Sequence, residues 1–464
     1  MGTDDLQQAL DERASAHELP GVAVGVLLDG VEHYAFHGVT SVENPLPVDA
    51  DTLFQFGSTG KTFTATAMMR LVDLGLVELD APVRRYVPEL RLKDEDVAER
   101  VTVLQLFNHT AGWQGDLMDN TGDGDDALER YVERMATIEQ STPLGATVSY
   151  NNASLSLAGR IIEKVTGATY EQAIKDLLVV PLGLDHTFFF PNEIMTRRFV
   201  VGHTRHDDGQ VTVSRPWALP RGGNPAGGMS ATAADQLAWA RFHLGDGTAP
   251  DGSRLLSGEL LRRMQQPTVD MVGSALGDHV GISWLLRDID GVALVGHGGS
   301  TIGQFSEFVL VPERGFAFTS LTNCGPNGPQ LNDELQRWAL EQFLGVVDRD
   351  PEPILLSDAA LAQYVGRYET IAAVCDVRAE DGRLLVSVTV KPEMAALLRE
   401  AGEEVPEDQL PVPVGLLSAD GDTYIVPDGP AKGMKGYFSR GPDGQVDGVH
   451  LGGRLATRTA PVPA

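Results

Sequence analysis

The sequence predicts a mixed α/β fold of the α+β type, followed by a small C-terminal β-barrel. Three observations lead to this fold class. Strand patterns lie near both ends of the first 345 residues, and helical periodicity dominates between them. A charged stretch with two prolines, VVDRDPEPI, occupies 346–354 and is typical of a linker. From 355 to 464 strands alternate with turns, which favours a small barrel.

The first predicted domain, 1–345, contains strands that are distant in the chain. A hairpin is expected at 21–38 around Asp29-Gly30, and further strands at 282–322. These strands can pair only within one antiparallel sheet, with helices packed on it and a helical subdomain between its halves. Apolar periodicity and capping residues predict the helices, which are expected at 4–18, 57–75, 155–167, 232–244 and 330–343.

The second predicted domain, 355–464, contains two strong hairpin patterns. One spans 374–390 around Asp381-Gly382, and the other spans 415–427. Between them, 392–411 combines a helical patch with an acidic loop.

Composition limits the possible partners. The chain has 464 residues and a formal net charge of −29, with 65 acidic against 36 basic residues. Such a surface repels phosphate backbones and anionic membranes, so neither nucleic acid nor a membrane is an expected partner. The N-terminus, MGTDDLQQALDERASAHELPG, resembles no secretory signal, so we expect a cytoplasmic protein. Cys324 and Cys375 form no disulfide framework and are expected to be buried thiols in a reducing compartment.

The most informative local motif is Gly57-Ser58-Thr59-Gly60-Lys61-Thr62, between a strand and a buried helix. A phosphate-binding P-loop would need a glycine at 55, where this chain has Gln. The alternative is S-x-x-K, which places Ser58 and Lys61 on one face of a helical turn. A buried lysine loses its proton more readily and can accept the serine proton, which makes the hydroxyl nucleophilic. Alone, this motif is explained better by a capping serine followed by a surface lysine, because S-x-x-K occurs by chance in many chains of this length.

Two further motifs accompany it. Tyr150-Asn151-Asn152 forms Y-x-N, and His297-Gly298-Gly299 follows the strand VALVG. In this order and spacing, the chain resembles the penicillin-recognising serine enzymes: class C β-lactamases, family VIII esterases and D-aminopeptidases. LFNHTAGW at 106–113 and GGMSATAADQLAWARF at 227–242 are similar to further segments of that family. The resemblance covers about 10–345, and 355–464 looks like the lipocalin-like domain often appended to these hydrolases.

The resemblance implies a role for each matched residue. Ser58 would form an acyl-enzyme, Lys61 would relay its proton, and Tyr150 would serve as general base and then as acid. Asn152 would orient Lys61 and contact the substrate. The backbone N–H groups of Ser58 and Ser300 would form an oxyanion hole. His297 and Gly299 would line the strand that docks the substrate.

The third motif departs from the K-T-G of β-lactamases and transpeptidases. A histidine is mostly neutral near pH 7, so it attracts a substrate carboxylate poorly. We therefore expect hydrolysis of an ester or amide, with weak β-lactamase activity as an alternative. A penicillin-binding-protein-type thioesterase or peptide cyclase, and a non-catalytic ligand-binding relative, also remain open. No metal or organic cofactor is implied, and a homo-oligomer is possible.

Other residues have competing interpretations. Trp113 could line the substrate pocket or belong to the core. His203 and His206 could suggest metal ligands, but a polar hairpin turn explains them more simply. Loops around 114–126, 215–228 and 270–280 are expected to govern the choice of substrate.

Overall fold

The computed structural model describes residues 2–117, 119–400, 411–419, 421–429 and 431–460. The chain divides into two compact units. The first contains 1–147, 151–268 and 280–348, and the second contains 148–150, 269–279 and 349–464. The predicted domain boundaries at 345 and 355 remain a prediction.

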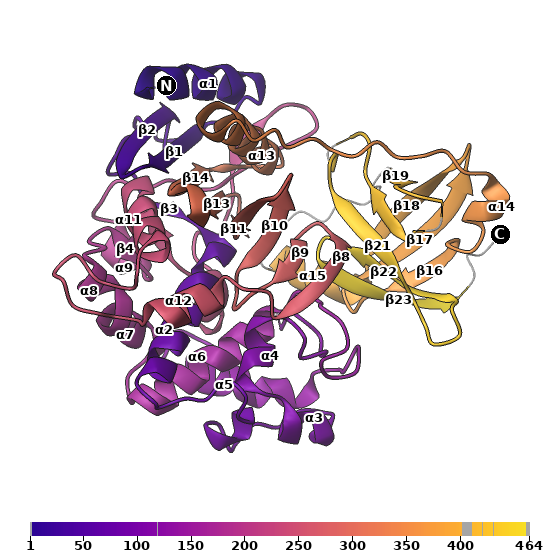
Figure 1. Ribbon diagram of the computed structural model, residues 1–464, viewed down its shortest axis with the longest axis horizontal. Helices are drawn as coiled ribbons and strands as arrows, with labels where there is room; N and C mark the ends of the chain where they lie inside the picture. The colour runs from indigo at the N-terminus through magenta and orange to yellow at the C-terminus, as the bar shows by residue number, and fades with distance from the viewer. Residues whose placement is uncertain (1, 118, 401–410, 420, 430, 461–464) are drawn as a thin grey trace. The chain divides into compact units, whose positions relative to one another are not determined.

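An antiparallel sheet forms the centre of the first unit (Figure 1). Its strands follow the order β2-β1-β14-β13-β11-β10, and β12 pairs with β13. Strands from both ends of the first unit therefore pair with each other, as the sequence predicted. The bounds are β1 Gly21–Leu28, β2 Val31–Gly38, β10 Leu285–Ile289, β11 Val292–Gly296, β12 Gly299–Ser300, β13 Phe305–Val311 and β14 Phe316–Thr322.

Helices cover both faces of this sheet, which explains why β1 is buried along nearly its whole length. Successive side chains of a strand point to opposite faces. Val22 and Val24 accordingly pack with α1 (Thr3–Ala16) and α13 (Asn327–Ala339), while Ala23 belongs to the cluster that contains α11 (Ala233–Leu244). The α+β fold class is confirmed.

The helical subdomain lies between the strands along the chain and contains α2 (Lys61–Asp73) and α6 (Asn152–Thr166). The predicted end of α6 is confirmed, because Gly167 caps it with a left-handed φ of 74°. The predicted Thr232 cap is also confirmed: its hydroxyl accepts from the backbone N–H of Asp235. Further helices are α3 Glu95–Arg100, α4 Val103–Phe107, α5 Ala127–Arg134, α7 Tyr170–Ile174, α8 Val180–Leu182, α9 Pro191–Ile194, α10 Asn224–Gly227 and α12 Gly258–Met264.

Short strands complete the first unit. They form two small sheets, β3-β7-β4 and β15-β5-β6. Their bounds are β3 Phe54–Gln55, β4 Thr187–Phe188, β5 His203–Arg205, β6 Val211–Val213, β7 Ser230–Ala231 and β15 Cys324–Gly325.

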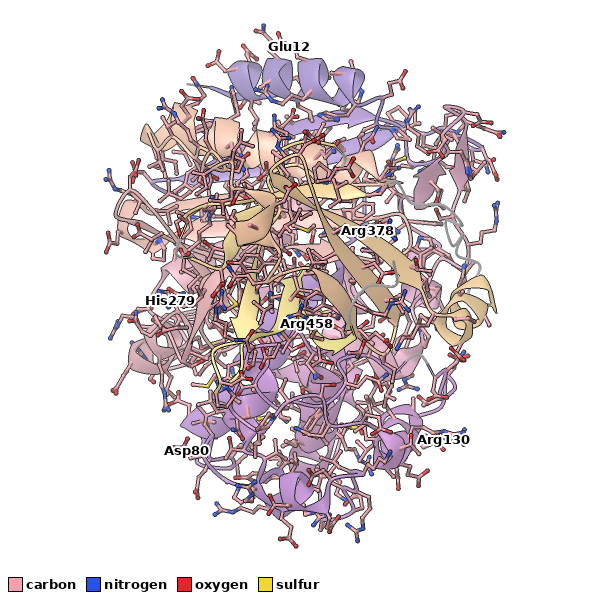
Figure 2. The ribbon with its side chains drawn as sticks, turned by 90° about the vertical axis from the view of Figure 1, so that its right-hand side faces the viewer. Glu12, Asp80, Arg130, His279, Arg378 and Arg458 are labelled. Carbon is pink, nitrogen blue, oxygen red and sulfur yellow. The ribbon has the colours of Figure 1, made fainter. Side chains whose placement is uncertain are left out.

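The second unit contains a closed barrel of eight strands, β16 to β23, paired in chain order. This confirms the predicted C-terminal barrel. Along β17, Cys375 and Val377 are buried, whereas Arg378 is exposed and labelled in Figure 2. The bounds are β16 Gly366–Glu369, β17 Ala373–Glu380, β18 Arg383–Val390, β19 Val412–Leu416, β20 Thr423–Ile425, β21 Lys435–Arg440, β22 Val446–Leu451 and β23 Arg454–Ala460, with helices α14 Asp358–Leu361 and α15 Pro392–Glu400.

Residues 270–280, expected to be a loop that governs the choice of substrate, instead form β8 (Val269–Ser274) and β9 (Gly277–Val280), which pair with each other. The expected acidic loop within 392–411 lies mostly outside the described residues. Cys324 and Cys375 are free and buried, as predicted. Across the described ranges, no helix is long and apolar enough to cross a membrane.

Candidate active site

The S-x-x-K motif begins in a tight turn. After β3, residues Gly57–Gly60 form one turn of 3-10 helix, and α2 begins at Lys61. The predicted helix thus starts three residues after Ser58. Gly57 has a left-handed φ of +52°, which favours glycine there. Ser58 is partly exposed, whereas Lys61 is fully buried at 0%.

The amine of Lys61 lies next to the hydroxyl of Ser58. Lys61 Nζ is 2.9 Å from Ser58 Oγ and donates to the carbonyl oxygen of Ala226 at 2.6 Å. The Ala226 carbonyl holds the amine in one orientation beside the hydroxyl. This geometry suits the transfer of the serine proton to Lys61.

A partly buried ion pair supports the Ala226 carbonyl. Glu171 accepts from Arg221 Nε at 3.1 Å and Nη2 at 3.0 Å, and from Asn224 Nδ2 at 2.7 Å. Asn224 opens α10, which contains Ala226. The bond to Glu171 raises the pKa of Arg221, so its charge is retained. The sequence analysis did not predict this support. Ala226 lies just outside the family-like segment at 227–242, and Glu171 belongs to none of the motifs found.

The strand that follows His297 packs directly against the Ser58 turn. Thr59 Oγ1 donates to the His297 carbonyl at 2.9 Å. A Cβ atom added to Gly299 would lie 2.0 Å from Phe56 O and 2.8 Å from Ser58 N, and one added to Gly57 would lie 2.6 Å from Ser300 N. Only glycines permit this approach of two backbones. The backbones of Ser58 and Ser300 are therefore adjacent, as an oxyanion hole requires.

His297 is a neutral side chain in this site. It is 3% exposed, and burial together with the Lys61 charge lowers its pKa to about 3, although the bond to Gly298 opposes the shift. Its Nδ1 lies 2.6 Å from the Gly298 carbonyl oxygen and must donate, because a carbonyl only accepts. The third motif therefore supplies no cation near pH 7.

Tyr150 and Asn152 have separate surroundings. Tyr150 belongs to the second unit, where its N–H donates to Gly453 O at 2.9 Å and its ring centroid lies 5.4 Å from Arg454 Cζ. Asn152 begins α6, and its Nδ2 donates to Asp116 Oδ1 at 2.6 Å. The structure thus brings together Ser58, Lys61, His297, Gly299 and Ser300. The roles of Tyr150 and Asn152 beside Ser58 stay a prediction.

Trp113 lies in the core rather than on an open surface. It is 2% exposed, and its Nε1 donates to Asn151 Oδ1 at 3.2 Å. In return, Asn151 Nδ2 donates to the Trp113 carbonyl at 2.9 Å. Of the two roles expected for Trp113, this burial supports the core role.

His203 and His206 lie in the predicted hairpin, which is confirmed as β5 paired with β6. His203 Nε2 accepts from Val42 N at 3.1 Å, and its Nδ1 donates to Asn323 O at 2.8 Å. His206 Nε2 pairs with Thr212 Oγ1 at 2.7 Å. Among the residues that the structure describes, no group of three His, Cys, Asp or Glu side chains could hold a metal.

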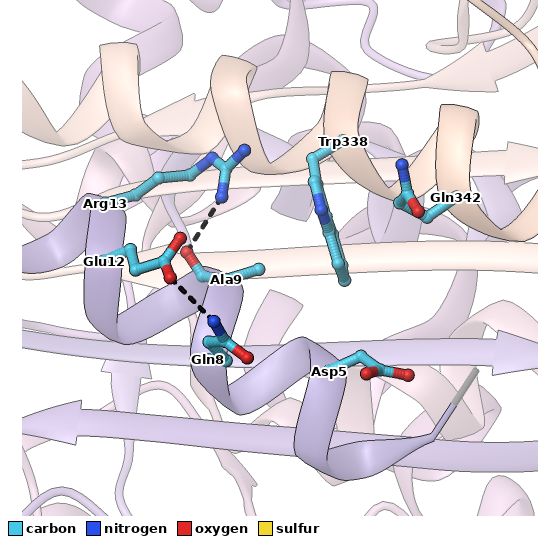
Figure 3. A pocket seen from close by; sticks show the side chains of 7 residues that line it. All are labelled: Asp5, Gln8, Ala9, Glu12, Arg13, Trp338 and Gln342. Atoms are coloured by element: carbon cyan, nitrogen blue, oxygen red, sulfur yellow. Dashed lines mark hydrogen bonds between the residues drawn. The ribbon is translucent and has the colours of Figure 1, made fainter.

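A separate hollow of about 390 Å³ lies between α1 and the helical segment around Trp338 (Figure 3). Its lining contains no serine, cysteine or histidine, and on its α1 side Gln8 Nε2 donates to Glu12 Oε1 at 2.9 Å. It offers no nucleophile, so the Ser58 turn remains the candidate active site. The lining residues are Asp5, Gln8, Ala9, Glu12, Arg13, Trp338 and Gln342.

Comparisons with known proteins identify the family of this chain. The Beta-lactamase family model matches residues 6–342. Penicillin-binding protein 4 of Amycolatopsis lactamdurans is 37% identical, over 78% of this chain and 96% of its own length. Among solved structures, SurE with D-Leu aligns with a TM-score of 0.76 at 24% identity, covering 98% of this chain and 99% of SurE.

The octameric penicillin-binding protein homologue from Pyrococcus abyssi aligns with a TM-score of 0.65 at 22% identity, covering 98% of this chain and all of that one (100%). These structural likenesses extend through the C-terminal barrel and show the shared fold. The family match and the Amycolatopsis relative go further, because they cover most of the sequence. The chain therefore belongs to the β-lactamase family of serine hydrolases, together with penicillin-binding proteins.

Proposed function

We propose that this chain hydrolyses an ester or amide bond through an acyl-enzyme on Ser58. The carrying observation is the 2.9 Å contact between the buried Lys61 amine and a partly exposed Ser58 hydroxyl. A serine needs an adjacent base to become a nucleophile, and Lys61 is fixed in that place by the Ala226 carbonyl.

The proposed reaction has two steps. Ser58 Oγ attacks the substrate carbonyl carbon, and its proton passes through Lys61 and Tyr150 to the departing alcohol or amine. A water molecule then attacks the acyl carbon and gives one proton to Tyr150, which passes it through Lys61 to the Ser58 oxygen as the acyl–oxygen bond breaks, the acid leaves and the Ser58 hydroxyl is restored. In both steps the negative oxygen receives hydrogen bonds from Ser58 N and Ser300 N, which favour the transition state over the planar carbonyl.

The charge of the third motif bears on the substrate class. A neutral, buried His297 gives no electrostatic attraction to a carboxylate at that position. Substrates that depend on such an attraction, including β-lactams, should therefore react slowly. Binding of an uncharged ester or amide does not depend on electrostatic attraction to a carboxylate, so we infer that such compounds are the better substrates.

One observation favours a second acyl acceptor besides water. SurE, a structural neighbour along both parts of this chain, was solved with D-Leu. A free amino acid could here attack the acyl-enzyme through its amine, which would give an amide instead of an acid. We therefore include D-amino acids and their derivatives as candidate acceptors and leaving groups.

The test is a substrate panel on the wild type and on Ser58→Ala. It contains p-nitrophenyl esters, D-amino acid amides and nitrocefin, with and without added D-Leu. We expect ester or amide turnover that Ser58→Ala abolishes while circular dichroism and the unfolding midpoint stay unchanged. Turnover that survives in Ser58→Ala, or nitrocefin as the best substrate by a wide margin, would contradict the proposal.

A further inference from the structure

We propose that His109 is a positioning residue of this hydrolase, holding the peptide bond that follows Tyr150 through its imidazole Nδ1. This inference rests on the proposed function, since it gives Tyr150 the role of proton carrier. It assigns a purpose to the LFNHTAGW segment, for which the motif comparison offered only a similarity.

The contact itself is direct. The backbone N–H of Asn151 donates to His109 Nδ1 at 3.2 Å, in a buried environment where both residues are 1% exposed. A nitrogen that accepts must carry no proton, so His109 acts here as neutral imidazole. Positions 109 and 151 are distant in the chain, and the contact therefore depends on the tertiary fold.

The position of this bond matters because peptide groups are planar. The N–H of Asn151 and the carbonyl of Tyr150 belong to one rigid plane, so fixing the N–H direction restricts the ψ angle of Tyr150. On its other side, the Tyr150 N–H donates to Gly453 O at 2.9 Å. Both peptide planes of Tyr150 are thus anchored, which leaves mainly side-chain rotation to place the phenol.

The backbone conformation of His109 is a second indication that this position requires a particular side chain. Its φ is +60°, a left-handed value that only a few per cent of non-glycine residues adopt, with histidine, asparagine and aspartate enriched among them. Such conformations cost free energy and persist where surrounding structure imposes them, often at functional sites. Glycine would adopt this φ without cost, yet it could not provide the acceptor.

The same segment holds Asn151 in a second way. Trp113 and Asn151 exchange two hydrogen bonds, and Asn151 Oδ1 also accepts from Ser154 N at 2.9 Å as the cap of α6. His109 and Trp113, four residues apart in the chain, therefore both hydrogen-bond to Asn151, the residue that follows Tyr150. The residue that they fix is the middle one of the Y-x-N motif.

The experiment compares two substitutions of His109. His109→Gly relieves the left-handed backbone and removes the acceptor. His109→Asn also tolerates the left-handed φ and offers an amide oxygen as many bonds from Cα as Nδ1 is. As a control, His243→Asn changes another buried histidine, 2% exposed, whose ring packs on Trp239 and Trp284. Pre-steady-state acylation by a p-nitrophenyl ester is measured per folded molecule, with kcat and KM determined separately.

We expect His109→Gly to lower the acylation rate and kcat about tenfold or more with little change in KM, since small misplacements of catalytic groups are costly. His109→Asn should recover to within about threefold of wild type, and His243→Asn should lower stability without this loss. The inference is overturned if His109→Gly acylates at the wild-type rate, or if His109→Asn is impaired equally. If the wild type itself shows no Ser58-dependent acylation, the proposed function fails instead.

Discussion

Adding a single methyl group at Gly299 should damage the site strongly. In Gly299→Ala, the new Cβ would lie 2.0 Å from Phe56 O, 2.7 Å from Ser306 Oγ and 2.8 Å from Ser58 N. Two of these atoms are backbone, and Phe56 O already accepts a hydrogen bond from Ser306 Oγ at 2.7 Å. The strand must therefore move away from the Ser58 turn.

The expected magnitudes follow from that movement. Overpacking of this kind costs about 1–3 kcal/mol of unfolding free energy. Displacement of Ser300 N from the oxyanion position should lower kcat/KM about 100-fold, the scale of losing one such donor. Urea unfolding measures the first effect, and ester hydrolysis per folded molecule measures the second.

The neighbouring glycine is a matched control. In Gly298→Ala, the Cβ would meet Glu307 Oε2 at 3.1 Å, which is the end of a flexible side chain. We expect this variant to stay within about threefold of wild-type kcat/KM, since its stability cost should be below about 1 kcal/mol. If Gly299→Ala keeps wild-type activity, or if both variants lose it equally, the argument from backbone contact at the Ser58 turn is refuted.

Three further results are expected. Because the pKa of His297 falls from 6.5 to about 3 on folding, the unfolded chain binds one more proton than the folded chain below about pH 6.5, so the free energy of unfolding should decrease from pH 6.5 toward pH 3. Urea unfolding at several pH values should show a weaker decrease for His297→Asn. An equal decrease in the variant and the wild type would contradict this prediction. Burial raises the thiol pKa of Cys324 and of Cys375 to about 11, so Ellman's reagent should modify neither thiol in the native protein and both after denaturation. Glu171→Ala should lower unfolding free energy by about 1–3 kcal/mol, since it removes the acceptor of Arg221 Nε and Nη2 and of Asn224 Nδ2 and leaves Asp125 as the carboxylate partner of Arg221. It should also reduce kcat through Ala226, and an unchanged kcat per folded molecule would contradict this second effect.

Local patterns predicted most of the fold. The hairpin at 21–38, the α6 helix and the Thr232 cap each depend on residues close in the chain, and each is present. The pair of β8 and β9 was not predicted. Whether such a segment forms a strand depends more on the strand it pairs with than on its own sequence.

The site was predictable only in part. Ser58, Lys61, His297, Gly299 and Ser300 were found because each belongs to a short motif. The groups that hold Lys61 in place were not predicted. The Ala226 carbonyl and the Glu171 carboxylate act through hydrogen bonds between segments that are distant in the chain. A carbonyl oxygen is present in every residue, so no residue type could have indicated that contact.

The central claim, that Ser58 is an activated nucleophile, is tested most directly by covalent labelling. The folded protein is treated with a fluorophosphonate, digested, and the modified peptide is identified by mass spectrometry. We expect one adduct on Ser58, absent from Ser58→Ala and formed much more slowly in Lys61→Met, whose unbranched side chain lacks the amine. A folded wild-type protein that stays unlabelled, or carries its label on another residue, would contradict the account.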